Sequence, residues 1–167
     1  MRIVDREDAD LLMLQDRPIT AIVPARGGSK GLPGKNLLKL GTLTLLERAI
    51  LIAKNCSHID RVIVSTDDDE MHRQALAHDA AAPNLRPAAL ATDTATTADV
   101  VRHLIDEAAI APGWLLLLQP TSPLRRLEDL HTLLELAEKT NAKSVVSVTA
   151  HEEPRPEKLL RLRDGEL

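Results

Sequence analysis

Short apolar segments alternate with amphipathic ones along most of this chain, and this alternation limits its fold more than any other feature. Four short runs rich in Val, Ile and Leu predict buried strands: Ile19–Val23, Arg61–Ser65, Trp114–Leu118 and Ser144–Val148. The segments between them carry apolar residues at helical spacing and predict helices: Leu43–Lys54, Asp67–His78, Thr96–Ala109 and Leu127–Lys139. Together they predict an α/β fold, a Rossmann-like, doubly wound and mainly parallel sheet with helices on both faces.

The composition predicts an aliphatic core and argues against several classes of partner. Only 1% of the 167 residues are aromatic, so Leu, Ile, Val and Ala must fill the core. The scarcity of aromatic side chains argues against single-stranded nucleic acid, which usually stacks its bases on such rings. A net charge of -4 gives no general attraction to nucleic acid or to anionic membranes.

The cysteine count and the absence of long apolar runs bear on the compartment. A single cysteine, Cys56, excludes a disulfide framework and a cysteine-based zinc site within one chain. The six histidines show no metal-ligand spacing, and we interpret them as surface or packing residues. No apolar run approaches membrane-spanning length, and the acidic segment Asp5–Asp10 is unlike a signal peptide. These observations predict a cytoplasmic protein.

The segment Pro24–Asn36 follows the first predicted strand and carries the clearest chemical signal. It contains four glycines and the cations Arg26, Lys30 and Lys35, with no acidic residue among them. Glycines let a backbone approach a ligand closely and turn its N–H groups inward, which together with three cations suits a polyphosphate. The alternative is a solvated loop with incidental basic residues. The position at the carboxyl end of a strand, where such sheets bind ligands, favours the polyphosphate site.

The glycine spacing in this loop matches neither of two better-known phosphate loops. A Walker loop needs glycine, four residues and then Gly-Lys-Ser/Thr, but Ser29 and Asn36 occupy the first and last of these positions. The dinucleotide motif Gly-x-Gly-x-x-Gly has no match either.

The loop resembles the N-terminal signature of the acylneuraminate cytidylyltransferases. Four further blocks resemble that family in the same order, so that the likeness covers roughly residues 19–150. These blocks are Val62–Asp67, Leu85–Thr97, Leu117–Arg125 and Ser144–Val148. The resemblance implies a fold of the nucleotide-diphospho-sugar transferase type. It also implies transfer of CMP from CTP to a nonulosonic, sialic-acid-like sugar, with release of pyrophosphate.

The resemblance also implies roles for individual residues. Arg26, Lys30 and Lys35 would hold the triphosphate, with Arg26 and Lys35 stabilising charge in the transition state. Asn36 and Arg86 would read the cytosine. For Arg86 a structural salt bridge is the alternative.

Two further positions match the family near the nucleoside and the sugar. Thr97 would lie near the nucleoside, and it is also one of three threonines suited to the start of a helix. Gln119 would face the sugar. Asp67, with Glu70 three residues on, is interpreted as the cap of a helix.

The resemblance further implies a cofactor, an assembly and a domain plan. The cofactor would be Mg²⁺ or Mn²⁺, but no metal ligands can be identified in this chain. We expect an N-terminal extension over 1–17, a nucleotide-binding cytidylyltransferase domain over 18–150, and a polar tail over 151–167. The tail would begin a missing dimerisation segment, which makes the family's homodimer doubtful at this chain length.

Two other functions stay open at this point. One is a truncated CTP-binding domain without catalytic turnover. The other is an RNA-binding domain, because Gly31–Gly34 has the form Gly-x-x-Gly, although the chain is acidic and its predicted elements do not suit a small RNA-binding fold.

Overall fold

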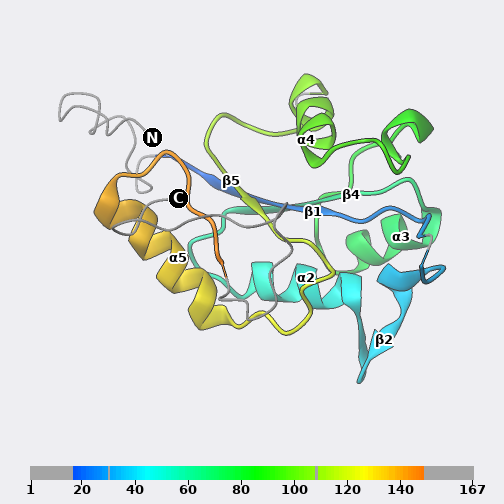
Figure 1. Ribbon diagram of the computed structural model, residues 1–167, viewed down its shortest axis with the longest axis horizontal. Helices are drawn as coiled ribbons and strands as arrows, with labels where there is room; N and C mark the ends of the chain where they lie inside the picture. The colour runs from blue at the N-terminus through cyan, green and yellow to red at the C-terminus, as the bar shows by residue number, and fades with distance from the viewer. Residues whose placement is uncertain (1–16, 30, 108, 149–167) are drawn as a thin grey trace, which may run out of the picture.

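A three-stranded parallel sheet lies at the centre of the computed structural model, which describes residues 17–29, 31–107 and 109–148 (Figure 1). Strand β1 (Ile19–Pro24) pairs with β4 (Arg61–Ser65) on one side and with β5 (Trp114–Leu117) on the other. In register, Ile22 of β1 lies beside Ile63 of β4 and Leu117 of β5. The predicted parallel α/β architecture is confirmed.

Helices cover both faces of this sheet (Figure 1). Helix α4 (Thr97–Asp106) lies on one face, and three helices lie on the other: α2 (Leu45–Lys54), α3 (Asp69–Ala77) and α5 (Leu127–Thr140). Successive side chains of β1 point to opposite faces, so that Ala21 and Val23 join one core cluster and Ile22 the other. Both clusters are almost wholly aliphatic, as the composition predicts.

The strand order β4-β1-β5 determines where a ligand can bind. After β1 the chain passes through α2 to β4 on one side, and then through α4 to β5 on the other side. The connections therefore diverge at β1. In open α/β sheets the crevice at such a divergence, outside the carboxyl ends of the strands, is the usual ligand site.

A short antiparallel hairpin precedes α2 and was not predicted. It pairs β2 (Lys39–Leu40) with β3 (Leu43–Thr44), and Gly41 between them has φ of 72°. Thr44 then caps α2: its side chain accepts from the Glu47 N–H, and the Glu47 carboxylate accepts from the Thr44 N–H. This capping box starts the helix two residues later than the prediction.

The predicted cap of α3 was wrong by one residue. The Asp68 carboxylate accepts from the Met71 N–H at 2.9 Å, so Asp68 is the cap and α3 begins at Asp69. The carboxylate of Asp67 accepts instead from the backbone N–H of Gly27 at 3.0 Å. Two consecutive aspartates therefore have different roles. The distance in sequence to Glu70 could not show which of them caps the helix.

The predicted fourth strand over Ser144–Val148 was also wrong. No strand in the described part of the chain pairs with this segment, and Val146 and Val148 are more than half exposed. A strand needs a partner for its backbone groups, and β-branched composition does not supply one.

The expected extension (1–17) and tail (151–167) lie outside the described residues, apart from Arg17. None of the described helices is long and apolar enough to cross a membrane.

Two remaining elements are single 3-10 turns, η2 (Lys35–Leu37) and η3 (Ala88–Leu90), which lie in the connections after β1 and after α3.

Gly113 precedes β5 at a point where the backbone has no room for a side chain. A Cβ at this position would overlap the carbonyl oxygen of Pro18, which accepts the N–H of Trp114. Gly113→Ala should lower the free energy of unfolding by about 1–3 kcal/mol, the usual cost of overpacking. Urea denaturation measures this. Gly28→Ala is the matched control because a Cβ there meets nothing within 4 Å. Equal stability of the two variants would contradict the packing argument.

The capping box of α2 makes stability depend on pH. The Thr44 N–H, opposed by burial and aided by His78, holds the pKa of Glu47 below its ordinary value of 4.5. A carboxyl whose folded pKa is depressed stabilises the fold above its unfolded pKa, and this stabilisation is lost as pH falls through the folded pKa. Glu47→Gln should therefore be less stable than wild type at pH 7, with the difference shrinking in acid. Urea midpoints across pH measure it, with exposed Glu135→Gln as control. A pH-independent difference would refute this reading.

Candidate functional site

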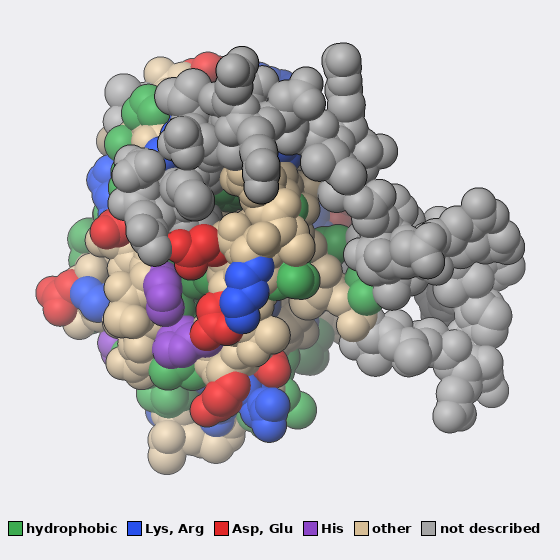
Figure 2. All heavy atoms as spheres, turned by 90° about the vertical axis from the view of Figure 1, so that its left-hand side faces the viewer, with side chains coloured by type: hydrophobic (Ala, Val, Ile, Leu, Met, Phe, Trp, Pro, Cys, Tyr) green, Lys and Arg blue, Asp and Glu red, His purple; other side chains and the backbone are tan. Residues whose placement is uncertain are grey.

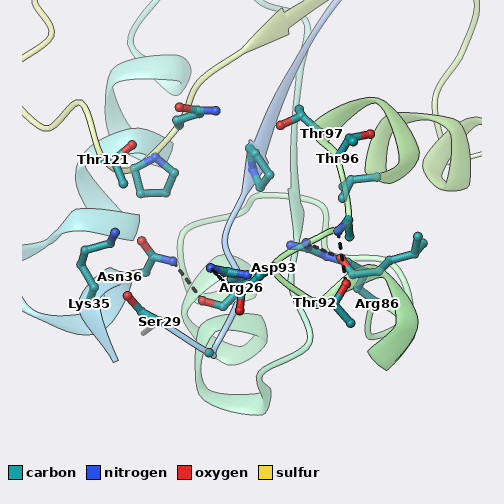
Figure 3. Close-up of a pocket in the computed structure, with 17 residues that line it drawn as sticks. Arg26, Ser29, Lys35, Asn36, Arg86, Thr92, Asp93, Thr96, Thr97 and Thr121 are labelled. Carbon is teal, nitrogen blue, oxygen red and sulfur yellow. Dashed lines mark hydrogen bonds and ion pairs between the residues drawn. The ribbon is translucent and has the colours of Figure 1, made fainter. Parts of the chain in front are cut away.

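A cavity of about 320 Å³ opens at the carboxyl ends of β1 and β5 (Figure 3). Its wall comes from the glycine loop, the segment 86–100 and the segment 119–121. Six of the seven site residues predicted from the sequence line it, namely Arg26, Lys35, Asn36, Arg86, Thr97 and Gln119. The seventh, Lys30, lies outside the described residues. Segments far apart in the sequence thus meet in one pocket, where the strand order places a ligand.

The glycine loop is held against the carboxyl end of β4. The Ala25 N–H donates to the Ser65 carbonyl at 2.9 Å, and the Gly27 N–H donates to the Asp67 carboxylate at 3.0 Å. A Cβ on Gly27 would come within 3.1 Å of Asp68, so glycine permits this close approach.

Farther along the loop, a left-handed glycine brings two site residues to the pocket. Gly34 has φ of 62° and precedes the 3-10 turn that carries Lys35 and Asn36. Because that conformation strains residues with a Cβ, the turn depends on glycine at this position.

The side chain of Asn36 is buried, with 7% of its surface exposed, and its orientation is fixed. Its Nδ2 donates to the Arg26 carbonyl at 3.1 Å (Figure 3). Its Oδ1 is buried and has no hydrogen-bond partner among the described residues. A buried acceptor without a partner is costly, so a donor on a bound ligand would complete it.

Arg86 is buried as well, and backbone carbonyls fix its guanidinium. One terminal nitrogen donates to the Ser65 carbonyl at 2.6 Å and the other to the Leu90 carbonyl at 3.2 Å. Its Nε is buried and has no partner in the described part of the chain. Burial lowers the pKa of Arg86, and Arg26 adds to this while Asp67 opposes it. The salt bridge that the sequence left open is absent from the described ion pairs.

Arg26 forms an ion pair that the sequence did not predict. Its guanidinium lies 2.7 Å from the carboxylate of Asp93, and both side chains are partly exposed (Figure 3). The loop's own residues include no acid, but the connection between α3 and α4 brings this one to it. Asp93 lies within Leu85–Thr97, the third of the five blocks that resemble the cytidylyltransferases, and this was its only signal in the sequence.

The amino end of α4 faces the pocket and presents small hydroxyl side chains. Thr96 caps the helix in a box with Asp99, and Thr97 is its first residue. Both line the cavity, so the helix-start alternative and a place in the pocket hold together for Thr97. The positive end of the helix dipole adds to the attraction for an anion.

The connection after β5 forms the opposite wall. Gln119 and Thr121 line the cavity, and the Gln119 carbonyl accepts from the Ser122 N–H at 3.2 Å. Ser29, Thr92 and Thr121 also line the pocket, and residue-by-residue reasoning on the sequence had not selected them. Isolated hydroxyl residues carry no distinctive spacing, so only the fold identifies them.

This geometry defines the class of protein. A parallel α/β domain with a basic glycine loop at the divergence of its strand connections is a nucleotide-binding domain of the Rossmann-like kind. The family model for cytidylyltransferases matches residues 20–166, and the chain belongs to this family.

Two relatives show which kinds of protein the chain is similar to in sequence. The chain is 39% identical over 137 residues to CMP-N,N'-diacetyllegionaminic acid synthase of Legionella pneumophila, covering 78% of this chain and 57% of that one. It is 36% identical over 137 residues to N-acylneuraminate cytidylyltransferase of Escherichia coli, covering 81% and 32%. The chain thus spans about half or less of the length of these relatives.

A solved structure shares the fold. CMP:2-keto-3-deoxy-manno-octonic acid synthetase complexed with CTP superposes with a TM-score of 0.62 at 25% identity, covering 75% of this chain and 49% of that one.

The Arg26–Asp93 pair should regulate anion binding in the cavity. Asp93→Asn should bind pyrophosphate several-fold more tightly, because the carboxylate competes for Arg26 and repels the anion. Arg26→Gln should bind it about tenfold more weakly, the loss of one charged hydrogen bond. Titration calorimetry at low salt measures both. Arg102→Gln, an exposed arginine on α4, is the matched control. Unchanged affinity in both pocket variants would show that pyrophosphate binds elsewhere.

Proposed function

We propose that this chain binds CTP in the cavity at the end of β1 and transfers CMP to a nonulosonic acid. In the reaction the anomeric hydroxyl oxygen of the sugar attacks the α-phosphorus. The bond from that phosphorus to the bridging oxygen breaks, pyrophosphate leaves with the bonding electrons, and the hydroxyl proton is released. The single observation that carries the proposal is a pair of buried polar atoms without a partner among the described residues, Asn36 Oδ1 and Arg86 Nε, on two residues that line a basic pocket.

These two atoms suit the edge of a cytosine. Cytosine offers an amino group as donor, and its ring nitrogen and carbonyl oxygen as acceptors. Asn36 Oδ1 needs a hydrogen-bond donor and the Arg86 Nε–H needs an acceptor. The edge of cytosine offers both kinds of group. Uracil presents a carbonyl where cytosine has its amino group, and that carbonyl would face the Asn36 oxygen without a proton between them. The pocket therefore favours CTP over UTP.

The cations serve the triphosphate in this proposal. Arg26 and Lys35 line the same cavity, and Lys30 belongs to the same loop by sequence. Phosphoryl-group transfer needs positioning and neutralisation of charge on the departing oxygens, and partly exposed Arg and Lys side chains adapt to both. We assign Arg26 and Lys35 to the transition state, Thr97 to the nucleoside and Gln119 to the sugar. The end of β5 leaves space for that sugar beside Gln119 and Thr121.

Magnesium or manganese fits this pocket poorly as an ion held by the protein. Mg²⁺ is commonly bound by one or two carboxylates together with substrate phosphates. Asp93 is the one carboxylate among the described residues that line the cavity, and it is paired with Arg26. We therefore derive no step of the reaction through a metal ion.

The remaining features follow from the family. We propose a nucleotide-binding unit over residues 18–150 and a cytoplasmic location where CTP is available. We do not extend the homodimer of the family to this chain. Sedimentation of the purified chain tests the assembly directly.

The function is tested by binding and turnover measured separately. Calorimetric titration with CTP, UTP, ATP and GTP in magnesium buffer should show a preference for CTP. Pyrophosphate release from CTP with N-acetylneuraminate, legionaminic acid and pseudaminic acid should then identify the sugar. CTP binding without pyrophosphate release from any sugar would support the alternative, a CTP-binding domain without turnover. Equal affinity for all four nucleotides would refute the proposal.

Asn36 should determine the choice of base. Asn36→Ala should lower CTP affinity by about tenfold, the worth of one buried hydrogen bond, and lower UTP affinity much less. The ratio of the two affinities separates base recognition from loop positioning, since a merely positional role would weaken both nucleotides equally. Asn84→Ala, in an exposed loop outside the cavity, is the matched control. An unchanged CTP/UTP ratio in Asn36→Ala would remove Asn36 from base recognition.

A further inference from the structure

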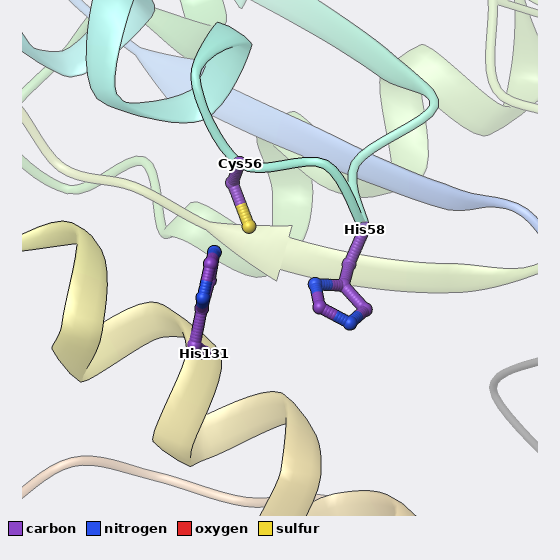
Figure 4. A group of neighbouring side chains, drawn as sticks. All are labelled: Cys56, His58 and His131. Carbon is purple, nitrogen blue, oxygen red and sulfur yellow. The ribbon is translucent and has the colours of Figure 1, made fainter.

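A cluster of one cysteine and two histidines lies outside the nucleotide pocket (Figure 4). Cys56 and His58 belong to the segment between α2 and β4, and His131 belongs to α5. The Cys56 sulfur and one ring nitrogen of each histidine lie within 4.8 Å of one another. In Figure 4 the thiol of Cys56 and the ring of His131 point toward each other, with the ring of His58 beside them. The sequence alone argued against such a site, because it offers one cysteine and no metal-ligand spacing among the histidines. The cluster escaped that analysis because its third residue comes from a distant helix.

The side chains of this cluster are incompletely satisfied as they stand. Cys56 is a free cysteine with 1% of its surface exposed. The Nε2 atom of His131 is buried and has no hydrogen-bond partner in the described part of the chain. The rings of His58 and His131 meet edge to face, with their centroids 5.3 Å apart. A buried imidazole nitrogen beside a buried thiol, with no partner, needs an explanation.

A metal ion would satisfy these atoms together. Thiolate and imidazole are ligands for zinc and similar transition metals, whereas magnesium and calcium prefer oxygen. Zn–S and Zn–N bonds of about 2.0–2.3 Å in a tetrahedron place ligand atoms about 3.3–3.8 Å apart. The observed limit of 4.8 Å is slightly wider, and His58, which is exposed, can turn its side chain inward to close the difference.

We propose that Cys56, His58 and His131 bind a zinc-class divalent ion, with water as the fourth ligand on the exposed side of His58. The thiol of Cys56 gives up its proton to solvent as its sulfur binds the ion, and no oxidation or reduction takes place. The ion joins the segment before β4 to α5, two parts of the chain that are far apart in sequence. Its role is therefore to stabilise the fold.

The site is separate from the proposed nucleotide pocket. The segment that carries Cys56 and His58 runs into β4 beside the start of β1, where the Asp60 N–H donates to the Ile19 carbonyl. That is the amino end of the strands, whereas the nucleotide cavity lies at their carboxyl ends. None of the three residues lines that cavity. CTP binding and zinc binding can therefore succeed or fail independently.

The experiment uses the full chain, purified without a polyhistidine tag and freed of metal. Competition with a chromophoric chelator should give one zinc ion per chain. Cobalt in place of zinc should give the ligand-field bands of tetrahedral coordination and a thiolate-to-cobalt charge-transfer band. His58→Asn and His131→Asn should each weaken binding by about tenfold or more, since each removes one of three protein ligands. His103→Asn, a histidine on α4, is the matched control and should bind like wild type.

Two further readouts connect the metal to the fold. Zinc should raise the Tm of the wild type by mass action and leave the Tm of His58→Asn nearly unchanged. It should also slow the alkylation of Cys56, a buried thiol that reacts only when this part of the fold opens. If Cys56→Ser fails to fold, His58→Asn still decides the matter, because the His58 side chain is exposed. Zinc binding that is equal in His58→Asn, His131→Asn and wild type, or cobalt binding without the charge-transfer band, would overturn the proposal.

Discussion

The position of β1 between two parallel partners is the constraint on which the rest of this molecule depends. Its side chains are buried on both faces, so Ala21 and Val23 build one core layer and Ile22 the other. Its backbone pairs along both edges. A strand in that position must end at the divergence of the connecting helices, and the glycine loop begins there. The same packing that stabilises the fold thereby fixes where a charged ligand can approach.

The loop depends in turn on the strand beside it. Ser65 at the end of β4 accepts from both the Ala25 N–H and the Arg86 guanidinium, and Asp67 accepts from the Gly27 N–H. Two segments of the pocket wall, the glycine loop and the segment 86–100, are therefore held by residues at the end of β4 and just after it. A carboxylate at position 67 also offsets part of the effect of burying a cation, since it opposes the lowering of the Arg86 pKa. Asp67 thus links the fold to the electrostatics of the site.

Sequence reasoning succeeded where a local pattern determines the structure and failed where tertiary contacts decide. Continuous apolar runs correctly predicted the positions of β1, β4 and β5, and burial on both faces explains the runs of β1 and β4. The predicted burial of the third run was wrong in part, because Leu115 and Leu117 of β5 are exposed. The run Ser144–Val148 has similar composition but no strand partner in the described residues, and composition cannot report a missing partner. In the site, glycines and cations after a strand were visible as a block. Asp93 and the Cys56–His131 proximity were not, because each depends on segments brought together only by folding.

The described pocket residues divide into a rigid group and an adaptable one, and this division matches the demands of a nucleotide. Asn36 and Arg86 are buried and held by backbone carbonyls, which fixes the direction of each remaining donor or acceptor. Recognition of a base depends on such direction, because one misplaced hydrogen bond reverses the preference. Arg26 and Lys35 are only partly buried, and Arg26 forms an ion pair with Asp93, which also lines the cavity. A polyphosphate changes its charge distribution as a bond breaks, so cations that can move with it serve better than fixed ones. Under the proposed function, the buried Asn36 and Arg86 would meet the base and the partly exposed Arg26 and Lys35 the phosphates, so the difference in burial matches the two roles.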